Sequence, residues 1–120
     1  MDTRFIGSIG EETAEKYLVN KSYKILHKNW TCHAGEIDLI AEKDSKIIFV
    51  EVKYVRNNFC KAYELFTFKK LRHLKRSIQQ FLLQEGKHTN NWSLDLVTID
   101  KKGNKITHYQ DIQSQLLRWY

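Results

Sequence analysis

The stretch GEIDLIAEKDSKIIFVEVKYV, residues 35–55, has the pattern of two β-strands joined by a turn at Lys43–Lys46. Side chains alternate between the two faces of a strand, so the turn determines which residues oppose one another across the hairpin. With the turn centred between Asp44 and Ser45, one face of the hairpin is wholly apolar. Its opposed pairs are Ile37 with Val52, Leu39 with Val50, and Ala41 with Ile48. We expect this face to pack under a helix.

The second face of the hairpin is apolar beside the turn and charged at the opposite end. There Asp38 opposes Glu51, and Glu36 opposes Lys53. Like charges placed directly opposite each other destabilise a sheet. A solvated face with a Glu36–Lys53 salt bridge explains one pair but leaves Asp38 facing Glu51. A Mg²⁺ or Mn²⁺ ion between the two carboxylates would resolve the conflict, and Lys53 would then meet a phosphate oxygen. The residues alone leave both interpretations open.

The rest of the chain supplies helices and further strands around this hairpin. Apolar residues at helical spacing predict helices over residues 8–20 and 68–85. Further strands are predicted over residues 24–30, 92–99 and 105–109. A last helix within residues 111–120 would dock Leu116, Leu117 and Trp119. The expected fold is α/β, with a mixed β-sheet flanked by helices in the order α-β-β-β-α-β-β-α.

Length and composition predict a single globular domain over residues 1–120, since 42% of the residues are hydrophobic and 12% aromatic. No apolar run approaches the ~20 residues that span a bilayer, and the N-terminus lacks the apolar core of a secretion signal. The two cysteines form no Cys-x-x-Cys pattern. We therefore expect a cytoplasmic protein without a membrane partner.

Basic residues exceed acidic ones, and one predicted helix concentrates them. The 20 Lys and Arg against 14 Asp and Glu give a net charge of +6, which favours polyanionic partners. Residues 69–76, KKLRHLKR, include no acid, and Lys69, Arg72 and Arg76 form one stripe with Lys70 beside it. Such stripes are often solvated helix faces, but beside a metal site this one would follow the phosphates of DNA. No base-reading motif is present, so we expect recognition of the DNA backbone or shape.

Several segments give the chain a family resemblance. Asp38, followed thirteen residues later by Glu51-Val52-Lys53, is similar to the D…(D/E)-x-K motif of restriction-endonuclease-like nucleases. The segments GSIGEETAEKYL, NW, GEIDLIAE and FVEVKYVR together resemble the YraN family of small bacterial proteins. That family is in turn similar to the archaeal Holliday junction resolvases. The resemblance covers Gly7 to about Ile99 and implies a restriction-endonuclease-like sheet.

The resemblance implies a metal-dependent endonuclease that hydrolyses DNA phosphodiester bonds, with branched or damaged DNA as candidate substrates. Asp38 and Glu51 would bind Mg²⁺ or Mn²⁺, and Lys53 would activate or orient the attacking water. Glu36 would be an auxiliary acid. Glu11, from the family's Gly-x-x-Gly-Glu, would reach the metal from the first helix. The implied catalytic residues are Asp38, Glu51, Lys53, Glu36 and Glu11.

Three features depart from the family pattern outside the metal set. Arg56 is displaced from the basic position that usually follows E-x-K, and we include it with the helix cations among the predicted DNA contacts. Cys60 replaces a customary glycine after Phe59. Asp95 matches the family's late Arg-Phe-Asp segment, but Ser93 stands in the place of the arginine. These departures concern substrate contacts and leave the implied metal ligands complete.

Alternatives remain for one residue and for the function. Ser8-Ile9-Gly10-Glu11 also fits the S-x-x-E capping box, in which Glu11 would bond the backbone at Ser8. A nucleic-acid-binding adaptor with the same fold and little turnover is one alternative to an active nuclease. A small structural partner of other proteins, with the charged face as an ordinary salt-bridge surface, is another. Symmetric cutting of both DNA strands would need two sites, so we expect a twofold homodimer for a nuclease of this size.

Overall fold

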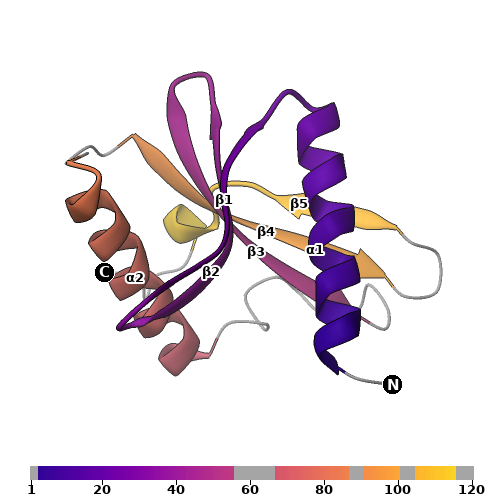
Figure 1. Cartoon of the computed structure of the whole chain (residues 1–120), viewed down its shortest axis with the longest axis horizontal. Coiled ribbons are helices and arrows are strands. Elements are labelled where there is room, and N and C mark those ends of the chain that lie inside the picture. The colour runs from indigo at the N-terminus through magenta and orange to yellow at the C-terminus, as the bar shows by residue number, and fades with distance from the viewer. Residues whose placement is uncertain (1–2, 56–66, 87–90, 101–104, 116–120) are drawn as a thin grey trace.

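The protein consists of a mixed β-sheet with helices packed on it (Figure 1). The computed structural model describes residues 3–55, 67–86, 91–100 and 105–115. The helices and strands are α1 (Thr3–Asn20), β1 (Lys24–Cys32), β2 (Gly35–Lys43), β3 (Lys46–Val55), α2 (Phe68–Gln84), β4 (Trp92–Asp100), β5 (Ile106–Tyr109) and the 3₁₀ helix η2 (Ile112–Gln115). The strands lie in the order β1-β2-β3-β4-β5, and β3 and β4 are the parallel pair. The predicted fold class is confirmed.

The C-terminal segment differs from the prediction within the part that the structure describes. Of the expected last helix, the described residues form only the short 3₁₀ helix η2. The residue before η2, Asp111, has a left-handed backbone conformation (φ 56°). The predicted docking residues Leu116, Leu117 and Trp119 lie outside the described residues.

The hairpin of β2 and β3 has the predicted register. Leu39 pairs with Val50, Ile40 with Phe49, and Ala41 with Ile48. The turn residues Asp44 and Ser45 have positive φ angles of 52° and 63°, which matches the two-residue turns whose twist suits antiparallel strands.

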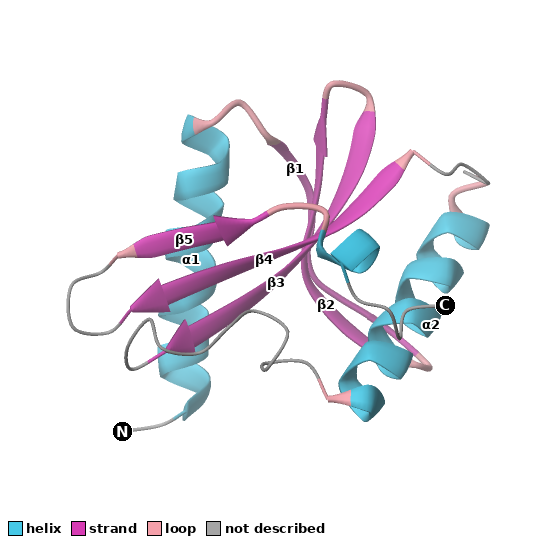
Figure 2. Ribbon diagram, turned by 180° about the vertical axis from the view of Figure 1, so that it is seen from behind, coloured by secondary structure: helices cyan, strands magenta, loops and turns pink. Residues whose placement is uncertain are grey.

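The ladder between β2 and β3 ends at Leu39 and Val50, before the charged pairs are reached. From there β2 stays paired to β1, and β3 stays paired to β4. Figure 2 shows the two strands diverging, with β2 running toward α2. The prediction that Asp38 opposes Glu51, Glu36 opposes Lys53 and Ile37 opposes Val52 is therefore wrong, because the backbone ladder does not extend to these residues.

Each face of the sheet is covered by one helix. The α1 face contains Ala14 and Leu18 of the helix, packed on Leu39, Ala41, Ile48, Val50, Val97 and Ile99. The α2 face contains Leu71, Leu74, Ile78 and Phe81, packed on Ile40, Phe49, Leu94 and Leu96. The expectation that the apolar hairpin face packs under a helix is confirmed for the pairs beside the turn. It is wrong for Ile37, which joins the α2 cluster because β2 has turned away from β3 at that point.

Gly10 allows α1 to lie close to β3. A Cβ atom at this position would be 2.6 Å from Cε2 of Tyr54, so any larger residue would require the tyrosine ring or the helix to move. Because α1 approaches the sheet here, the next residue, Glu11, is brought over the strands that bear the charged residues. None of the helices in the described ranges is long and apolar enough to cross a membrane.

Candidate metal centre

Three carboxylates from two distant parts of the chain meet where β2 leaves β3. One oxygen each of Glu11 on α1 and of Glu36 and Asp38 on β2 lie within 4.8 Å of one another. Two oxygens bound to one Mg²⁺ lie at most about 4.2 Å apart, because each Mg–O distance is about 2.1 Å. Small side-chain rotations would therefore close this group on one ion.

The position of Glu11 excludes the capping-box interpretation. An N-cap residue has non-helical backbone angles, and α1 already begins at Thr3, so Ser8 lies inside the helix. Burial raises the pKa of the Glu11 carboxyl, and the negative charges of Asp38 and Glu36 raise it further. A hydrogen bond from the Asn29 side chain acts in the opposite direction and lowers it. Glu11 thus lies in a negative environment that a bound cation would relieve.

Asp38 is held against the backbone of β3. Its Oδ2 atom accepts a hydrogen bond of 2.9 Å from the Val52 amide, the residue between Glu51 and Lys53. The bond joins β2 to β3 beyond the end of their ladder. A carboxylate fixed in this way keeps its orientation, which is the usual requirement for a metal ligand.

Glu51 is the most deeply buried carboxylate near this group, with 2% of its surface exposed. Its Oε1 atom lies 3.0 Å from Nζ of Lys70 and 3.9 Å from Nζ of Lys53. Its Oε2 atom is buried without a hydrogen-bond partner among the described residues. Burial raises the pKa of Glu51 to about 7, and the negative charge of Asp38 contributes, although Lys70 and Lys53 oppose the shift.

An unsatisfied buried oxygen is costly, and a divalent cation is one group that would satisfy it. The carboxylate oxygens of this region are the hard ligands that Mg²⁺ and Mn²⁺ prefer, so the residues fit such an ion. The structure groups Glu36, expected only as an auxiliary acid, with Glu11 and Asp38. Glu51 lies beside the three rather than among them, and its direct coordination of metal stays a prediction.

The Glu36–Lys53 salt bridge of the alternative interpretation, a solvated charged face, is not formed among the described residues. The ion pair of Lys53 is with Glu51, because Glu36 follows β2 toward α2 while Lys53 follows β3. The pairing of Lys70 with Glu51 was not anticipated. A signal for it is present in the chain, since Lys70 immediately precedes Leu71 and therefore flanks the apolar stripe that faces the sheet.

The basic residues of α2 lie beside the carboxylates. Lys69, Arg72 and Arg76 are exposed, whereas Lys70 is half-buried. The start of α2 and the start of β2 line a cavity of about 400 Å³, and Lys69, Lys70 and Glu36 contribute to this lining. Arg56, the other predicted DNA contact, lies outside the described residues.

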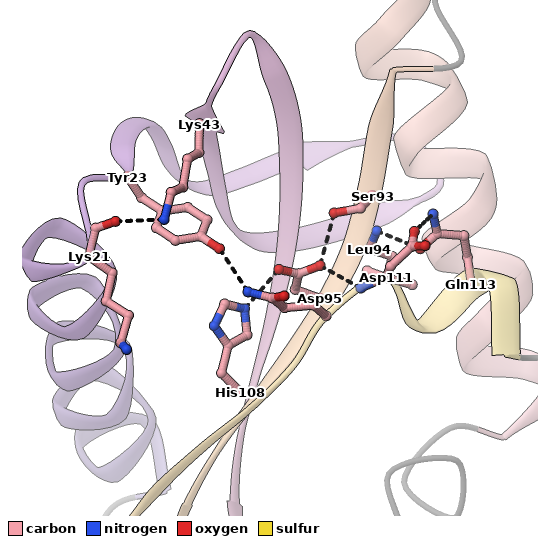
Figure 3. Close-up of polar contacts among 10 residues, drawn as sticks. Lys21, Tyr23, Lys43, Ser93, Leu94, Asp95, His108, Asp111 and Gln113 are labelled. Atoms are coloured by element: carbon pink, nitrogen blue, oxygen red, sulfur yellow. Dashed lines mark hydrogen bonds and ion pairs between the residues drawn. The ribbon is translucent and has the colours of Figure 1, made fainter.

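Asp95 belongs to a different network, which attaches β5 and η2 to β4 (Figure 3). Its Oδ1 atom accepts hydrogen bonds of 2.9 Å from the Ser93 hydroxyl and from the Asp111 amide. Its Oδ2 atom lies 2.7 Å from Nε2 of His108, and the His108 ring packs edge-on against Tyr17. Ser93, which stands where the family resemblance expects an arginine, is thus a hydrogen-bond donor to Asp95.

The model of the uncharacterised protein family UPF0102 matches residues 10–99. A UPF0102 protein of Sulfurihydrogenibium sp. (strain YO3AOP1) is 38% identical over 112 residues, which are 92% of this chain and 96% of that protein. A UPF0102 protein of Caldicellulosiruptor saccharolyticus is 38% identical over 100 residues, 82% of this chain and 85% of that one.

Two solved structures share a lower similarity with this chain. The crystal structure of SSO0001 has a TM-score of 0.46 at 18% identity, covering 91% of this chain and 52% of that one. SfsA of Pyrococcus furiosus, solved in complex with Ca²⁺, has a TM-score of 0.40 at 13% identity and is covered over 64% of its length. The family assignment therefore rests on the sequence matches: the chain belongs to UPF0102, the YraN family that its motifs resemble.

Proposed function

We propose that this protein is a Mg²⁺- or Mn²⁺-dependent endonuclease that hydrolyses phosphodiester bonds of DNA. The observation that carries the proposal is the grouping of Glu11, Glu36 and Asp38 next to the buried Glu51 with its unsatisfied oxygen. When ionised, these four carboxylates exceed the two ammonium groups of Lys53 and Lys70 by two negative charges. One divalent cation has the charge that balances this excess.

The proposed reaction needs only water as its second substrate. The water oxygen forms a bond to phosphorus, the bond from phosphorus to the leaving sugar oxygen breaks, and that oxygen takes up a proton. A bound divalent ion would supply positive charge to the phosphate and lower the pKa of the water. Asp38 and Glu11 would hold the ion, and the ammonium of Lys53 would stabilise negative charge that develops on the phosphoryl group.

The exposed cations of α2 support DNA as the polyanion. Lys69 and Lys70 border the cavity next to Glu36, so a DNA strand lying there would place its phosphates close to the carboxylates. Arg72 and Arg76 continue the positive surface along the same helix. Contacts of this kind neutralise phosphates without reading bases, which suits recognition of backbone or branched structure.

Replacing Arg72 and Arg76 together by glutamine should weaken DNA binding and reduce its dependence on salt. Removing one cation that neutralises a phosphate lowers the slope of log K against log salt concentration by about 0.9, so removing both should lower it by nearly 2. Binding titrations at four salt concentrations measure the slope. Lys16→Gln, an exposed cation on α1, is the matched control. An unchanged slope in the double variant would remove α2 from the DNA surface.

A catalytically weak DNA-binding adaptor is the second candidate. The observation in its favour is that Glu51 already forms an ion pair with Lys70. Glu51 also lies beside the three grouped carboxylates rather than among them. An adaptor would keep the positive surface and the metal group but would not turn over substrate.

Cleavage of DNA in the presence of Mn²⁺ distinguishes the two candidates. Linear, nicked and four-way-junction DNA would be incubated with wild type, Asp38→Asn, Glu51→Gln and the exposed control Glu12→Gln. A nuclease should cut at least one substrate, and the two site variants should lose about 100-fold or more in rate, a typical cost of removing charge stabilisation. Binding without cleavage by wild type favours the adaptor. Equal behaviour of wild type and both site variants would eliminate the proposed site.

A further inference from the structure

Lys70 contacts a buried carboxylate and also lines an open cavity. Its Nζ atom is 3.0 Å from Oε1 of Glu51, whose side chain is only 3% exposed, whereas the side chain of Lys70 is 36% exposed. Lys70 also lines the cavity of about 400 Å³ that contains Glu36 and Lys69. The same cation therefore has access to the metal centre and to the surface where DNA would lie.

Lys70 and a divalent ion would compete for the carboxylate of Glu51. One oxygen of Glu51 contacts Lys70, and the other is buried without a partner among the described residues. An ion that approaches this carboxylate would repel an ammonium group only 3.0 Å from it. Lysine has a flexible four-carbon stem, so the ammonium can leave Glu51 without any movement of the helix.

The backbone at Lys70 is anchored, which limits movement to the side chain. Thr67 caps α2, and its hydroxyl accepts a hydrogen bond of 3.1 Å from the Lys70 amide. Within the described residues the other cation near Glu51 is Lys53, whose Nζ atom lies 3.9 Å from Oε1 of Glu51 and which is two residues away on the same strand. Lys70 is thus the cation that comes to Glu51 from a different element, the helix on which we place the DNA surface.

We propose that Lys70 is a built-in counter-cation that competes with the divalent metal for Glu51 and moves to a DNA phosphate in the adjacent cavity. DNA binding would draw Lys70 away from Glu51 and so strengthen metal binding, and metal binding would release Lys70 for the phosphate. Metal and DNA affinities are then coupled through this positioning residue. The inference rests on the proposed metal-dependent action on DNA and adds its regulation.

Mn²⁺ affinity with and without a short DNA duplex tests this coupling, with the duplex checked for integrity on a gel after each titration. Wild type should bind Mn²⁺ at least about fivefold more tightly when DNA is present, the lower end of usual coupling between two sites. Without DNA, Lys70→Met should bind Mn²⁺ more tightly than wild type does. Adding DNA should increase its Mn²⁺ affinity clearly less than it does for wild type. Lys69→Met, which removes an exposed cation from the same cavity, should lower the affinity for DNA. Its Mn²⁺ affinity should still increase on adding DNA as much as that of wild type.

A double-mutant cycle assigns the effect to the contact with Glu51. In the Glu51→Gln background, Lys70→Met should no longer tighten Mn²⁺ binding, and the neutral pair also avoids an unbalanced buried charge that could impair folding. A wild type whose Mn²⁺ affinity is the same with and without DNA contradicts the coupling and leaves the proposed nuclease intact. The coupling through Lys70 is also contradicted if DNA increases the Mn²⁺ affinity of Lys70→Met and of Lys69→Met by the same factor. A wild type that binds no Mn²⁺ overturns both proposals.

Discussion

Replacing Asp95 by alanine should lower the free energy of unfolding by about 3–5 kcal/mol, because each buried polar group left without its hydrogen-bond partner costs about 1–3 kcal/mol. Asp95 is 1% exposed, and its carboxylate accepts from Ser93 and Asp111 and contacts His108. Its removal leaves three polar groups without the acceptor that now serves all of them. The effect should be large because these bonds attach β5 and η2 to β4 (Figure 3).

Urea unfolding at pH 7 measures this prediction for Asp95→Ala. Ser93→Ala removes one of the three donors and should cost only about 1 kcal/mol. Glu12→Ala, on the exposed side of α1, should leave the free energy of unfolding nearly unchanged. A decrease below about 1 kcal/mol for Asp95→Ala would mean that the network contributes little to stability.

The Glu51→Gln variant should lose a large part of the pH dependence of stability. The pKa of Glu51 is raised from 4.5 to about 7 in the folded protein, so the native state binds a proton more tightly than the unfolded chain. The stability of the wild type should therefore fall as the pH rises from about 4.5 to about 7. At 1.36 kcal/mol per pKa unit, the decrease from this one group is about 3 kcal/mol.

Glutamine cannot ionise, so Glu51→Gln should be more stable than wild type at pH 8 and similar to it near pH 4.5. Unfolding curves at several pH values, without divalent metal, provide the comparison. Glu85→Gln replaces an exposed carboxylate and should retain the wild-type pH dependence. Addition of Mn²⁺ at pH 8 should stabilise wild type more than Glu51→Gln. If the free energy of unfolding changed with pH in the same way for wild type and Glu51→Gln, ionisation of Glu51 would not destabilise the folded protein.

The hairpin was predictable because its determinants are local. Two strand-like apolar segments and a turn at Asp44 and Ser45 fix the register, which the structure confirms up to Leu39 and Val50. The divergence of the strands beyond that pair was not predictable, since each strand there follows its outer neighbour, β1 or β4, and that depends on the tertiary packing of the whole sheet. For this reason Ile37 was assigned to the wrong face of the sheet.

The candidate site was predictable in part. The meeting of Glu11 with Asp38 was implied by the family resemblance, and the packing of α1 through Gly10 provides its structural basis. The contact of Lys70 with Glu51 joins two elements that are separated by residues outside the described ranges, and helical periodicity gives only the side of α2 on which Lys70 lies. Pairing of specific charges across elements requires tertiary packing, which no local pattern contains.

Calorimetric titration of the metal-free protein with Mn²⁺ tests the central claim, that these carboxylates form a divalent-cation site. Wild type should bind Mn²⁺, and Asp38→Asn and Glu11→Gln should each weaken binding at least about tenfold, the lower end of the cost found even for residues that only support a ligand. Glu12→Gln, the exposed neighbour of Glu11 on α1, should bind as wild type does. Absence of binding by wild type, or equal binding by all four proteins, would contradict the assignment of a metal centre to Glu11, Glu36 and Asp38.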